Sequence, residues 1–480
     1  MNHIPLQALR RSAPFNLPIK FLQFGQGNFM RGFFDWQVDL LNERSGLNAG
    51  VVVVRPRGGS GSPLLDVQDG LFTTVVRGLD EVGQPVSTCR TISCVQREIN
   101  PVSMYGDYLE LASLPELRFI VSNTTEAGIV TNDSDAFDDA PPSSFPAKLA
   151  RLLFDRYAYF EGDRTKGVVL LPCELIEQNG PALKAAVLHF ARLWQLEAGF
   201  ADWLENACVF CSTLVDRIVT GYPQDAAAIE AELGYRDQFM VAAEYYYLFV
   251  IEGPASLDDE LKLAGANLNI LLVDDITPYK KRKVGILNGG HTALVPVALL
   301  AGLETVGEAV NDAQVGGYLT DTLAQEIIPA LPLAQDELQQ FARDVLLRFR
   351  NPYIQHRLAS IALNSWSKFA ARIAPQLLGY VELHGRLPQR LVLALAATMR
   401  LYRGDVVALS DDAASLTWFR QNWADVDAGR LSLQQLAQDW LAQENVWSRD
   451  LNAVPGLTQA VATALQDIAS QGMRGALQAL

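Results

Sequence analysis

The fold is decided near the N-terminus by Ile19-Lys-Phe-Leu-Gln-Phe24, which runs directly into Gly25-Gln-Gly27-Asn28-Phe29-Met30-Arg31. The first six residues predict a buried strand, and the apolar spacing from Phe33 to Leu41 predicts a helix. A strand, a Gly-x-Gly turn and a helix in this order are typical of a unit that binds a dinucleotide. We therefore expect a nucleotide to lie against this turn.

The next strong pattern is Val51-Val-Val-Val54, an uninterrupted apolar run. Such a run is typical of a parallel strand that is covered on both faces, and its distance from Gly25 fits one crossover helix. These patterns predict an α/β fold with a Rossmann-like dinucleotide-binding domain.

Two positions depart from the usual dinucleotide fingerprint. Met30 occupies the third glycine position, so helix and strand cannot pack as closely as usual. The second strand ends in Arg55, where an NAD-binding fold usually places an acid on the ribose hydroxyls. Because an arginine there can accept a 2'-phosphate, the sequence leaves NADP open beside NAD.

Composition excludes several classes of partner. The 480 residues carry a net charge of -15, so we expect no nucleic acid and no anionic membrane as partner. An anionic substrate would need a local cationic pocket.

The N-terminus has no signal-peptide pattern and the chain has no long apolar run, so we expect no membrane span. Five cysteines make no disulfide framework, which favours the cytoplasm. A monomer and a small homo-oligomer stay open.

Polar residues follow two further strand patterns. Phe119-Ile-Val-Ser leads into Asn123 and Glu126, and Gly167-Val-Val-Leu-Leu-Pro leads into Cys173 and Asn179. Parallel strands present ligand-facing loops at their carboxyl ends, so these residues are candidates for the site. Asn179 is either a turn former before Gly180 or a donor to a substrate oxygen. Between these patterns and the second strand, residues 70–76 and 91–96 predict an edge hairpin.

Strand patterns become scarce beyond about residue 280. Helical periodicity fills residues 295–330, 336–348, 353–373, 388–403, 413–424, 431–443 and 456–478. We therefore predict two domains: a Rossmann-like domain over residues 1–279 and a mainly helical, substrate-binding domain over residues 280–480.

The junction of the two patterns holds Lys283-Val-Gly-Ile-Leu-Asn288-Gly-Gly-His291. In an α-helix at about 100° per residue, the lysine, asparagine and histidine share one face of about 140°. An ammonium, an amide and an imidazole on one face could manage the proton and the oxygen of a carbonyl group. The paired glycines cost roughly 1 kcal/mol each against alanine, and they let a ligand or another backbone come close. The alternative is a solvated lysine, a helix-start asparagine and a core histidine.

Other polar residues also have two interpretations. Asp216 beside Arg217, within an apolar run, favours a structural ion pair over a place in a site. Arg350 before Asn-Pro favours a brace for a helix start, and Lys368 between aromatic residues favours a surface lysine. Both cations would also suit an anionic sugar acid. Cys208 and Cys211 form a lone Cys-x-x-Cys, which favours buried small side chains over zinc or redox chemistry.

Four motifs together resemble the long-chain mannitol dehydrogenase family over about residues 18 to 402. They are Phe24-Gly-Gln-Gly-Asn-Phe-Met-Arg31, Gln68-Asp-Gly-Leu-Phe-Thr73, Val215-Asp-Arg-Ile218 and the Lys283, Asn288 and His291 set. The stretches Ser122–Gly128, Phe137–Pro142 with Phe145–Lys148, Thr213–Pro223 and Arg348–Ile354 are similar to the branch of this family that acts on hexuronic acids.

This resemblance implies a zinc-independent reduction of D-tagaturonate to D-altronate with NADH, in hexuronate catabolism. It implies that Lys283 is the acid and base, that Asn288 and Asn179 hold the carbonyl oxygen, and that His291 orients the substrate. Neighbouring Lys280, Lys281 and Arg282 could lower the lysine pKa. The implied substrate residues are Asp216, Lys368 and Arg350. The implied cofactor residues are Leu22, Gln23, Phe24, Gly25, Gln26, Gly27, Asn28, Phe29, Met30, Arg31, Arg55, Asn123 and Glu126.

One position departs from the family pattern: an arginine expected eight residues before Lys368 is Ser360 here. The departure is consistent with a uronate in place of a polyol, and it leaves Arg350 and Arg357 as candidates for the substrate carboxylate. Fructuronate reduction to D-mannonate, another polyol or sugar-acid oxidation, and a nucleotide-binding sensor without turnover are the alternatives to tagaturonate reduction.

Overall fold

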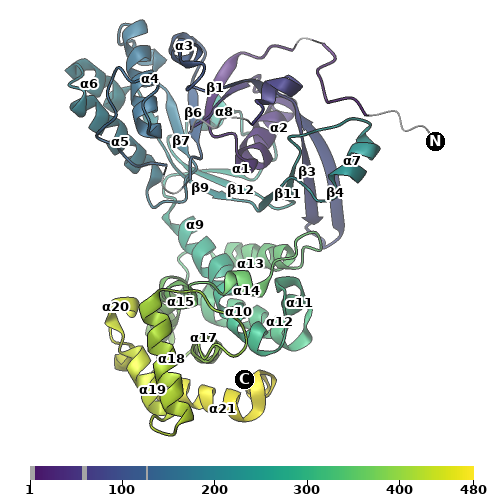
Figure 1. Cartoon of the computed structure of the whole chain (residues 1–480), viewed down its shortest axis with the longest axis vertical. Helices are drawn as coiled ribbons and strands as arrows, with labels where there is room; N and C mark the ends of the chain where they lie inside the picture. The colour runs from purple at the N-terminus through teal and green to yellow at the C-terminus, as the bar shows by residue number, and fades with distance from the viewer. Residues whose placement is uncertain (1–5, 14, 57–61, 126–127) are drawn as a thin grey trace. The chain divides into compact units, whose positions relative to one another are not determined.

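The computed structural model describes residues 6–13, 15–56, 62–125 and 128–480 (Figure 1). The chain divides into two compact units. Unit 1 is Met1–Arg77 with Val86–Ile276, and unit 2 is Gly78–Pro85 with Thr277–Leu480. The division after residue 276 lies close to the predicted boundary at 279/280, whereas the hairpin tip Gly78–Pro85 falls outside the unit in which the sequence placed it.

A six-stranded sheet forms the centre of unit 1. Its order is β5 (Val95–Ile99), β2 (Gly50–Val54), β1 (Ile19–Phe24), β6 (Phe119–Ser122), β7 (Val169–Pro172) and β8 (Val209–Phe210). Each neighbouring pair is parallel. The direction of strand succession reverses between β1 and β6, which is the switch point at which such sheets bind ligands. The predicted α/β class and Rossmann-like domain are confirmed.

Two smaller sheets complete unit 1, and the predicted hairpin belongs to the first of them. One has the order β10 (Val219–Gly221), β11 (Val241–Glu244), β3 (Phe72–Leu79) and β4 (Pro85–Ile92). The other has the order β13 (Ile270–Val273), β12 (Leu248–Glu252) and β9 (Ser212–Asp216). The predicted hairpin was partly wrong: β3 pairs with β4, and Val95 already belongs to the parallel sheet because it pairs with Val51.

The helices of unit 1 follow the predicted alternation with strands. They are α1 (Asn28–Met30), η1 (Arg31–Asp35) and α2 (Trp36–Arg44), which form one continuous run, then η2 (Leu65–Gln68), α3 (Tyr105–Glu110), η3 (Leu111–Ser113), α4 (Phe145–Tyr159), η4 (Arg164–Lys166), α5 (Asn179–Leu193), α6 (Ala198–Asn206), α7 (Ala226–Leu233) and α8 (Leu257–Leu261). The run after Gly27 is α-helical except at η1, which is a π-helix.

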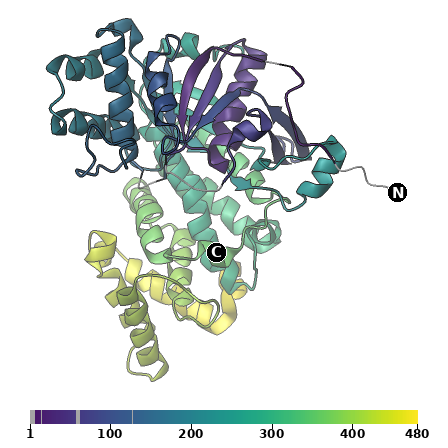
Figure 2. The same ribbon diagram turned by 45° about the horizontal axis from the view of Figure 1, so that its top comes forward.

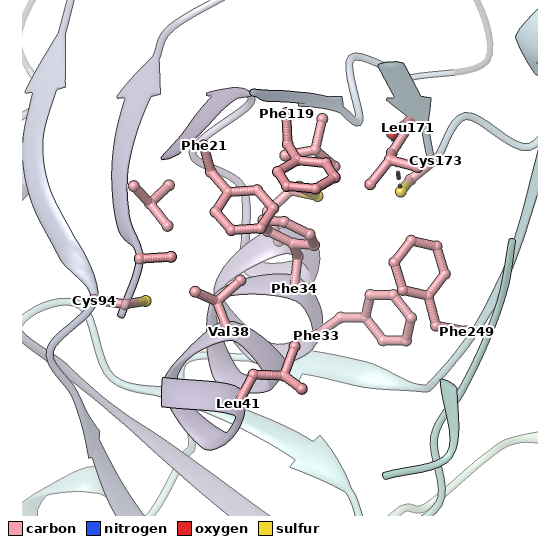
Figure 3. Packing of buried hydrophobic residues seen from close by; sticks show 14 of the residues in the cluster. Phe21, Phe33, Phe34, Val38, Leu41, Cys94, Phe119, Leu171, Cys173 and Phe249 are labelled. Atoms are coloured by element: carbon pink, nitrogen blue, oxygen red, sulfur yellow. Dashed lines mark hydrogen bonds between the residues drawn. The ribbon is translucent and has the colours of Figure 1, made fainter. Parts of the chain in front are cut away.

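Both faces of the parallel sheet are covered, as the Val51–Val54 run predicts. Val51 and Val53 belong to the cluster beneath α2, where Phe21 stacks on Phe119 at 4.8 Å and meets Phe34 edge-on at 5.5 Å (Figure 3). Val52 and Val54 belong to the opposite cluster, with residues of α4, α5 and α6. The blue helices α4 to α6 lie over that face in Figures 1 and 2. The sheet is thereby shielded from water, and only its strand ends are open to a ligand.

Unit 2 is helical beyond the hairpin tip. Its elements are α9 (Thr277–Arg282), η5 (Lys283–Asn288), α10 (Gly289–Leu300), α11 (Val306–Asn311), α12 (Ala313–Thr322), η6 (Leu323–Ile327), η7 (Ile328–Ala330), α13 (Gln335–Phe349), α14 (Leu358–Ile361), α15 (Ser365–Arg372), α16 (Ala374–His384), α17 (Gln389–Leu401), α18 (Ala413–Asp427), α19 (Leu433–Leu441), α20 (Glu444–Trp447), η8 (Leu451–Ala453) and α21 (Leu457–Gln478). The mainly helical second domain is confirmed, and α16 and the short α20 lie outside the helical ranges that the periodicity predicted.

The run Thr277–Leu300 is the core helix of unit 2. Its best 18-residue window has a mean hydropathy of 1.2, which by length and composition alone would suffice to cross a membrane, but 67% of that window is buried inside the structure. Ala293, Leu294 and Val297 are fully buried. Such burial is typical of a helix that packs within a helical domain.

The side chain of Gln23 links a buried carboxyl group, that of Asp35, to the turn that follows β1, which we call the nucleotide turn. Gln23 Nε2 donates to the carbonyl of Gly25 at 2.9 Å and to Asp35 Oδ2 at 3.3 Å. Asp35 is fully buried, and its Oδ1 has no hydrogen-bond partner among the described residues. Burial raises the pKa of Asp35 from 3.8 to about 7, although Gln23 and Arg31 act in the opposite direction.

This raised pKa predicts a specific pH dependence of stability. The unfolded chain ionises Asp35 above about pH 4, whereas the folded chain keeps it protonated to about pH 7, so stability falls as pH rises through this window. Asp35→Asn removes the effect. Between pH 5 and 7 the unfolding free energy of this variant, measured relative to that of the wild type, should rise by about 1.4 kcal/mol for each pH unit. Urea unfolding at several pH values measures this gain. The exposed Asp138→Asn is the control, and parallel curves for Asp35→Asn and wild type would contradict the assignment.

Candidate functional site

The turn after β1 requires glycine at its first position. Gly25 has a φ of +124°, and a Cβ built there would lie 2.7 Å from the carbonyl oxygen of Asn123. Its N–H donates to Val54 O at 3.0 Å, and Asn123 N donates to Phe24 O at 3.0 Å. The parallel ladder thus continues past the strand ends and closes the turn against its neighbours.

Gly27 differs from Gly25, because the space beside its Cα is open, whereas the space beside Gly25 is occupied by the Asn123 carbonyl. It precedes α1 with φ −62° and ψ 164°, and a Cβ there would meet no described atom within 4 Å. Arg31 braces the turn by donating to Gln26 O at 3.0 Å and Asn28 Oδ1 at 2.7 Å. An open backbone at the start of a helical run is what a dinucleotide pyrophosphate needs. The residues present therefore fit a nicotinamide dinucleotide.

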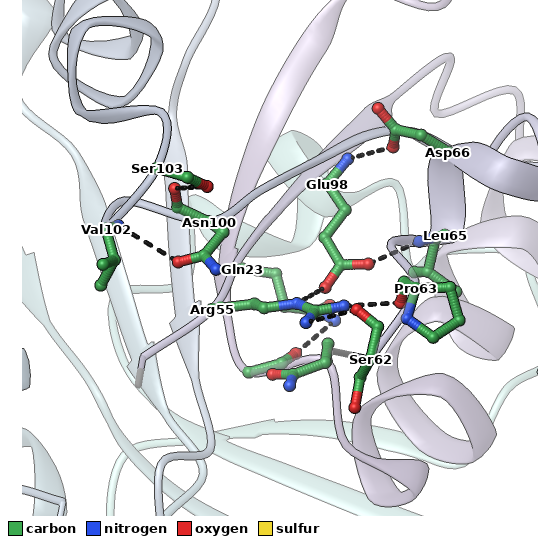
Figure 4. A network of polar contacts seen from close by, with 12 residues as sticks. Gln23, Arg55, Ser62, Pro63, Leu65, Asp66, Glu98, Asn100, Val102 and Ser103 are labelled. Carbon is green, nitrogen blue, oxygen red and sulfur yellow. Dashed lines mark hydrogen bonds and ion pairs between the residues drawn. The ribbon is translucent and has the colours of Figure 1, made fainter. Parts of the chain in front are cut away.

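Arg55 has a structural role that removes the reason for considering NADP (Figure 4). Its Nε donates to Glu98 Oε1 at 2.6 Å, and its Nη atoms donate to Ser62 O at 3.1 Å and Pro63 O at 2.7 Å. Both partners of this ion pair are almost fully buried. The guanidinium is therefore engaged by β5 and the loop after β2, and the predicted 2'-phosphate contact is not supported.

The loops after β6 and β7 are tied together by Glu174. Its carboxylate accepts hydrogen bonds from Ser122 Oγ at 3.0 Å and from both the N–H and the hydroxyl of Thr124 at 2.9 Å. Asn123 Nδ2 donates to Cys173 O at 2.9 Å. Glu126 lies outside the described residues. The sequence predicts both loops at the strand ends but assigns no role to Glu174, a polar residue two positions after the buried strand β7.

Asn179 is engaged by backbone groups of unit 1. It is 1% exposed, and its Nδ2 lies within 2.8 Å of Pro172 O and 3.2 Å of both Glu174 O and Thr213 O. Its Oδ1 accepts from Thr213 N at 2.9 Å. An amide has only two N–H hydrogens, so in this arrangement none remains for a substrate oxygen. The predicted oxyanion role of Asn179 is not supported here, and the residue positions the loop that follows β7.

Asp216 and Arg217 stand at the end of β9, and both are buried. Arg217 Nε donates to Glu244 O at 2.9 Å, and its Nη1 donates to Gly32 O at 2.7 Å. Its guanidinium also lies over the Trp36 ring at 4.2 Å. Arg217 therefore holds β9, β11 and the helix after the nucleotide turn together, while Asp216 stays a predicted substrate residue.

In unit 2 the predicted reaction centre lies on a distorted helix. Lys283–Asn288 forms a π-helix, and Gly289 N–H donates to Val284 O, five residues back. Because residues five apart come closer to one face in a π-helix than in an α-helix, Lys283 and Asn288 approach a common face more closely than predicted. Single π-turns are frequent at functional sites, since they re-aim side chains within a rigid helix.

The side-chain amide of Asn288 makes no hydrogen bond with any described residue, although its backbone carbonyl accepts from Thr292 Oγ1 at 2.9 Å. It is half-buried, and it is therefore available to a ligand in a way that Asn179 is not. Gly289 after it serves packing, because a Cβ there would lie 3.2 Å from Ile373 Cδ1 and 3.3 Å from Val284 O, whereas a Cβ on Gly290 would make only ordinary contacts.

His291 sits among cations. Its ring stacks on Phe349 at 4.0 Å and meets His356 edge-on at 5.3 Å. Its Nε2 is buried and has no hydrogen-bond partner in the described part of the chain. Burial first, and then the positive charges of His356, Arg348, Arg372 and Lys368, hold the pKa of His291 well below 6.5. The imidazole is therefore neutral at pH 7, and one ring nitrogen remains for a ligand.

Two other predicted cations differ in their surroundings. Lys368 is half-buried, and its Nζ donates to Ile361 O at 2.9 Å. Arg350 is exposed at the end of α13. Arg282, one of the residues expected to lower the lysine pKa, pairs with Glu337 at 2.6 Å and lies over the Phe341 ring at 4.4 Å. Arg348 and Arg372, which do act on His291, were missed by the sequence reasoning.

Cys208 and Cys211 are both buried free thiols. Burial raises the pKa of each to about 12, so both stay protonated at pH 7. Reactive cysteines need the opposite shift. These residues behave as the small apolar side chains that the sequence favours.

Two family models match the chain. The mannitol dehydrogenase Rossmann domain matches residues 19–265, and the mannitol dehydrogenase C-terminal domain matches residues 275–469. The chain belongs to the mannitol dehydrogenase family. Within this family it is similar to proteins named altronate oxidoreductase. That of Yersinia pestis bv. Antiqua (strain Nepal516) is 54% identical over 467 residues, 96% of this chain and 97% of the relative. That of Escherichia coli O6:K15:H31 (strain 536 / UPEC) is 53% identical over 468 residues, which cover 96% of this chain and 97% of the relative.

Two solved structures share the fold of the mannitol dehydrogenase family. A D-sorbitol dehydrogenase in substrate-free form has a TM-score of 0.78 at 20% identity, with 98% of each chain covered. The Pseudomonas fluorescens mannitol 2-dehydrogenase in ternary complex with NAD and D-mannitol has a TM-score of 0.67 at 21% identity, with 99% of this chain and 96% of that chain covered.

The two glycines of the nucleotide turn predict different losses on substitution. Gly25→Ala should lower the unfolding free energy by about 1–3 kcal/mol, because of its positive φ and the close Asn123 carbonyl. Gly27→Ala should leave stability nearly unchanged and weaken NADH binding, because its Cβ enters the space beside the helix start. Thermal unfolding and fluorescence titration with NADH measure the two effects. Equal NADH affinity in Gly27→Ala and wild type would show that the nucleotide does not approach this turn.

Proposed function

We propose that the chain is an NAD-dependent altronate oxidoreductase, which reduces D-tagaturonate to D-altronate reversibly in the hexuronate catabolism of the cytoplasm. The observation that carries this proposal is the likeness to proteins of that name at 54% identity over nearly the whole of both chains. The Lys283, Asn288 and His291 set on a π-distorted helix supports the same chemistry.

The nucleotide would be held by the residues of the β1 turn, from Leu22 to Arg31, with Asn123 beside them. When bound, NADH supplies the hydride that reduces the keto carbon of the substrate. NAD is favoured over NADP because the guanidinium of Arg55 is engaged by Glu98 and by the carbonyls of Ser62 and Pro63.

In unit 2 the helical run Thr277–Leu300 provides the residues for proton transfer, for binding the substrate oxygen and for orienting the substrate. The ammonium of Lys283 donates a proton to the substrate oxygen as that oxygen gains negative charge, and in the oxidation its amine takes the proton back. The amide of Asn288, which has no hydrogen bond to a described residue, donates to the same oxygen. The neutral His291 orients a substrate hydroxyl through its unpartnered Nε2. Asp216 and Lys368 complete the proposed substrate residues.

The activity test is the decrease of NADH absorbance with each candidate ketouronate. We expect the purified protein to oxidise NADH with D-tagaturonate. Lys283→Ala should abolish turnover and leave NADH affinity largely intact, since the lysine moves the proton and does not hold the nucleotide. Oxidation of NADH with D-fructuronate alone would replace the proposal by mannonate formation. Absence of turnover with every ketouronate and polyol, with NADH still bound, would indicate a sensor.

The two asparagines predict opposite outcomes. Asn288→Ala should lower kcat by about 10²-fold with little change in Tm, because it removes a donor to the developing oxyanion. Asn179→Ala should lower the unfolding free energy by about 1–3 kcal/mol, because it leaves buried carbonyls and Thr213 N–H unpaired. Steady-state kinetics and thermal unfolding of both variants measure this contrast. An Asn179→Ala protein with wild-type Tm and the kcat of Asn288→Ala would assign the oxyanion role to Asn179 as well.

A further inference from the structure

Two cations of α15 face the same way without an acidic partner. Lys368 and Arg372 are four residues apart on this eight-residue helix, so they share one face. Both are half-buried. Like charges at this spacing destabilise a helix, and partial burial of charge adds a desolvation cost. Arg372 lies in the last turn of α15, where the helix dipole favours a cation, but no described carboxylate pairs with either cation, and a bound anion would offset the remaining cost.

The hydrogen bonds of these cations leave most of their donors open. Among the described residues, Lys368 Nζ donates to Ile361 O at 2.9 Å and Arg372 Nη1 approaches Thr292 Oγ1 at 3.5 Å. Neither cation forms an ion pair with a described carboxylate. Asp411 acts on Lys368 electrostatically, but its carboxylate accepts the hydrogen bond of the Tyr402 hydroxyl.

This cationic pair adjoins the proposed reaction centre through one residue. Thr292, which Arg372 approaches, follows His291 directly, and its hydroxyl donates to the backbone carbonyl of Asn288. The positive charges of both α15 cations reach His291. The guanidinium of Arg372 therefore lies beside Thr292, which is one helical turn after Asn288 on the helix that carries Asn288 and His291.

We propose that Arg372, together with Lys368, binds the carboxylate of the uronate substrate. This assignment rests on the proposed function, because a hexuronate differs from a neutral ketose in carrying a carboxylate. A guanidinium presents two parallel N–H groups to a carboxylate, which gives direction as well as charge. Binding one anion would also relieve the repulsion between the two cations, and it supplies the local positive pocket that a chain of net charge -15 requires.

The arginines suggested by the sequence are less suited. Arg350 and Arg357 are both exposed. Ser360, at the position of the family arginine, is exposed as well, and its hydroxyl donates to Arg357 O at 2.7 Å. An exposed cation in water holds a carboxylate weakly. Arg372 combines partial burial with open donors, and it therefore explains how a substrate carboxylate is recognised without the family arginine.

The test compares a charged substrate with its neutral analogue in the full-length enzyme. In Arg372→Gln, kcat/KM for D-tagaturonate should fall about 10- to 100-fold, mainly through KM, while kcat/KM for the neutral ketose D-tagatose should stay within about twofold of the wild type. Arg372→Lys should restore part of the loss for tagaturonate. The control is Arg343→Gln, an exposed arginine of α13 that bonds Gln340 and should change neither value.

A binding measurement separates this assignment from the proposed function. Calorimetry should show that wild type binds D-altronate more tightly than neutral altritol, and that Arg372→Gln loses this preference with an unchanged Tm. If wild type turns over tagaturonate and Arg372→Gln keeps its KM, the carboxylate assignment is wrong and the function stands. If no ketouronate is turned over, a preference for altronate that Arg372→Gln removes would keep the assignment. Equal losses for charged and neutral ligands, with a lowered Tm, would make Arg372 structural.

Discussion

Parallel pairing of β1 with β2 on one side and β6 on the other is the constraint on which unit 1 depends. The ladder does not end where the strands end: Gly25 N–H donates to Val54 O, Asn123 N–H to Phe24 O, and Cys173 N–H to Ser122 O. These bonds fix three loops at one edge of the sheet. Because every one of these strands points the same way, the loops that leave them meet at the switch point without a dedicated scaffold. Glu174 then joins the loops after β6 and β7 by side-chain bonds, and Asn179 joins the loop after β7 to Thr213 of β9.

The sequence predicts best those elements whose pattern lies within a short stretch of the chain. Apolar runs located β1, β2, β6 and β7, because a buried parallel strand is apolar on both faces. The hairpin partner of β3 was misplaced because residues 91–96 span the end of β4 and the start of β5, and only the pairing shows where one strand ends and the next begins. The π-turn at Lys283–Asn288 also escaped the sequence. Its effect is a local change of hydrogen-bond register, which an apolar pattern at 3.6 residues per turn does not record.

Side-chain roles were harder to predict than elements, because they depend on distant partners. Arg55 stands where a ribose-binding acid is usual, yet its role is set by Glu98, 43 residues away. Asn179 was placed correctly at the end of a strand, but Thr213 and two carbonyls engage its amide. Lys283, Asn288 and His291 were easier to find because all three lie on one helix. Arg372 carries no sequence signal of its own and becomes informative only through its contact with Thr292.

Three buried arginines elsewhere in the chain provide a comparison for the α15 cations. Arg156 donates to the carbonyls of Lys166, Ala112, Leu114 and Leu117, and so it is neutralised by backbone dipoles. Arg55 and Arg282 each pair with a glutamate. In these three cases the fold supplies oxygen atoms to a desolvated guanidinium, although the buried Nε of Arg282 keeps no hydrogen-bond partner among the described residues. Arg372 has one long contact with a hydroxyl, and it lies four residues from a second cation. Among the described residues its remaining N–H groups have no acceptor, and an anionic substrate held beside Asn288 would supply one.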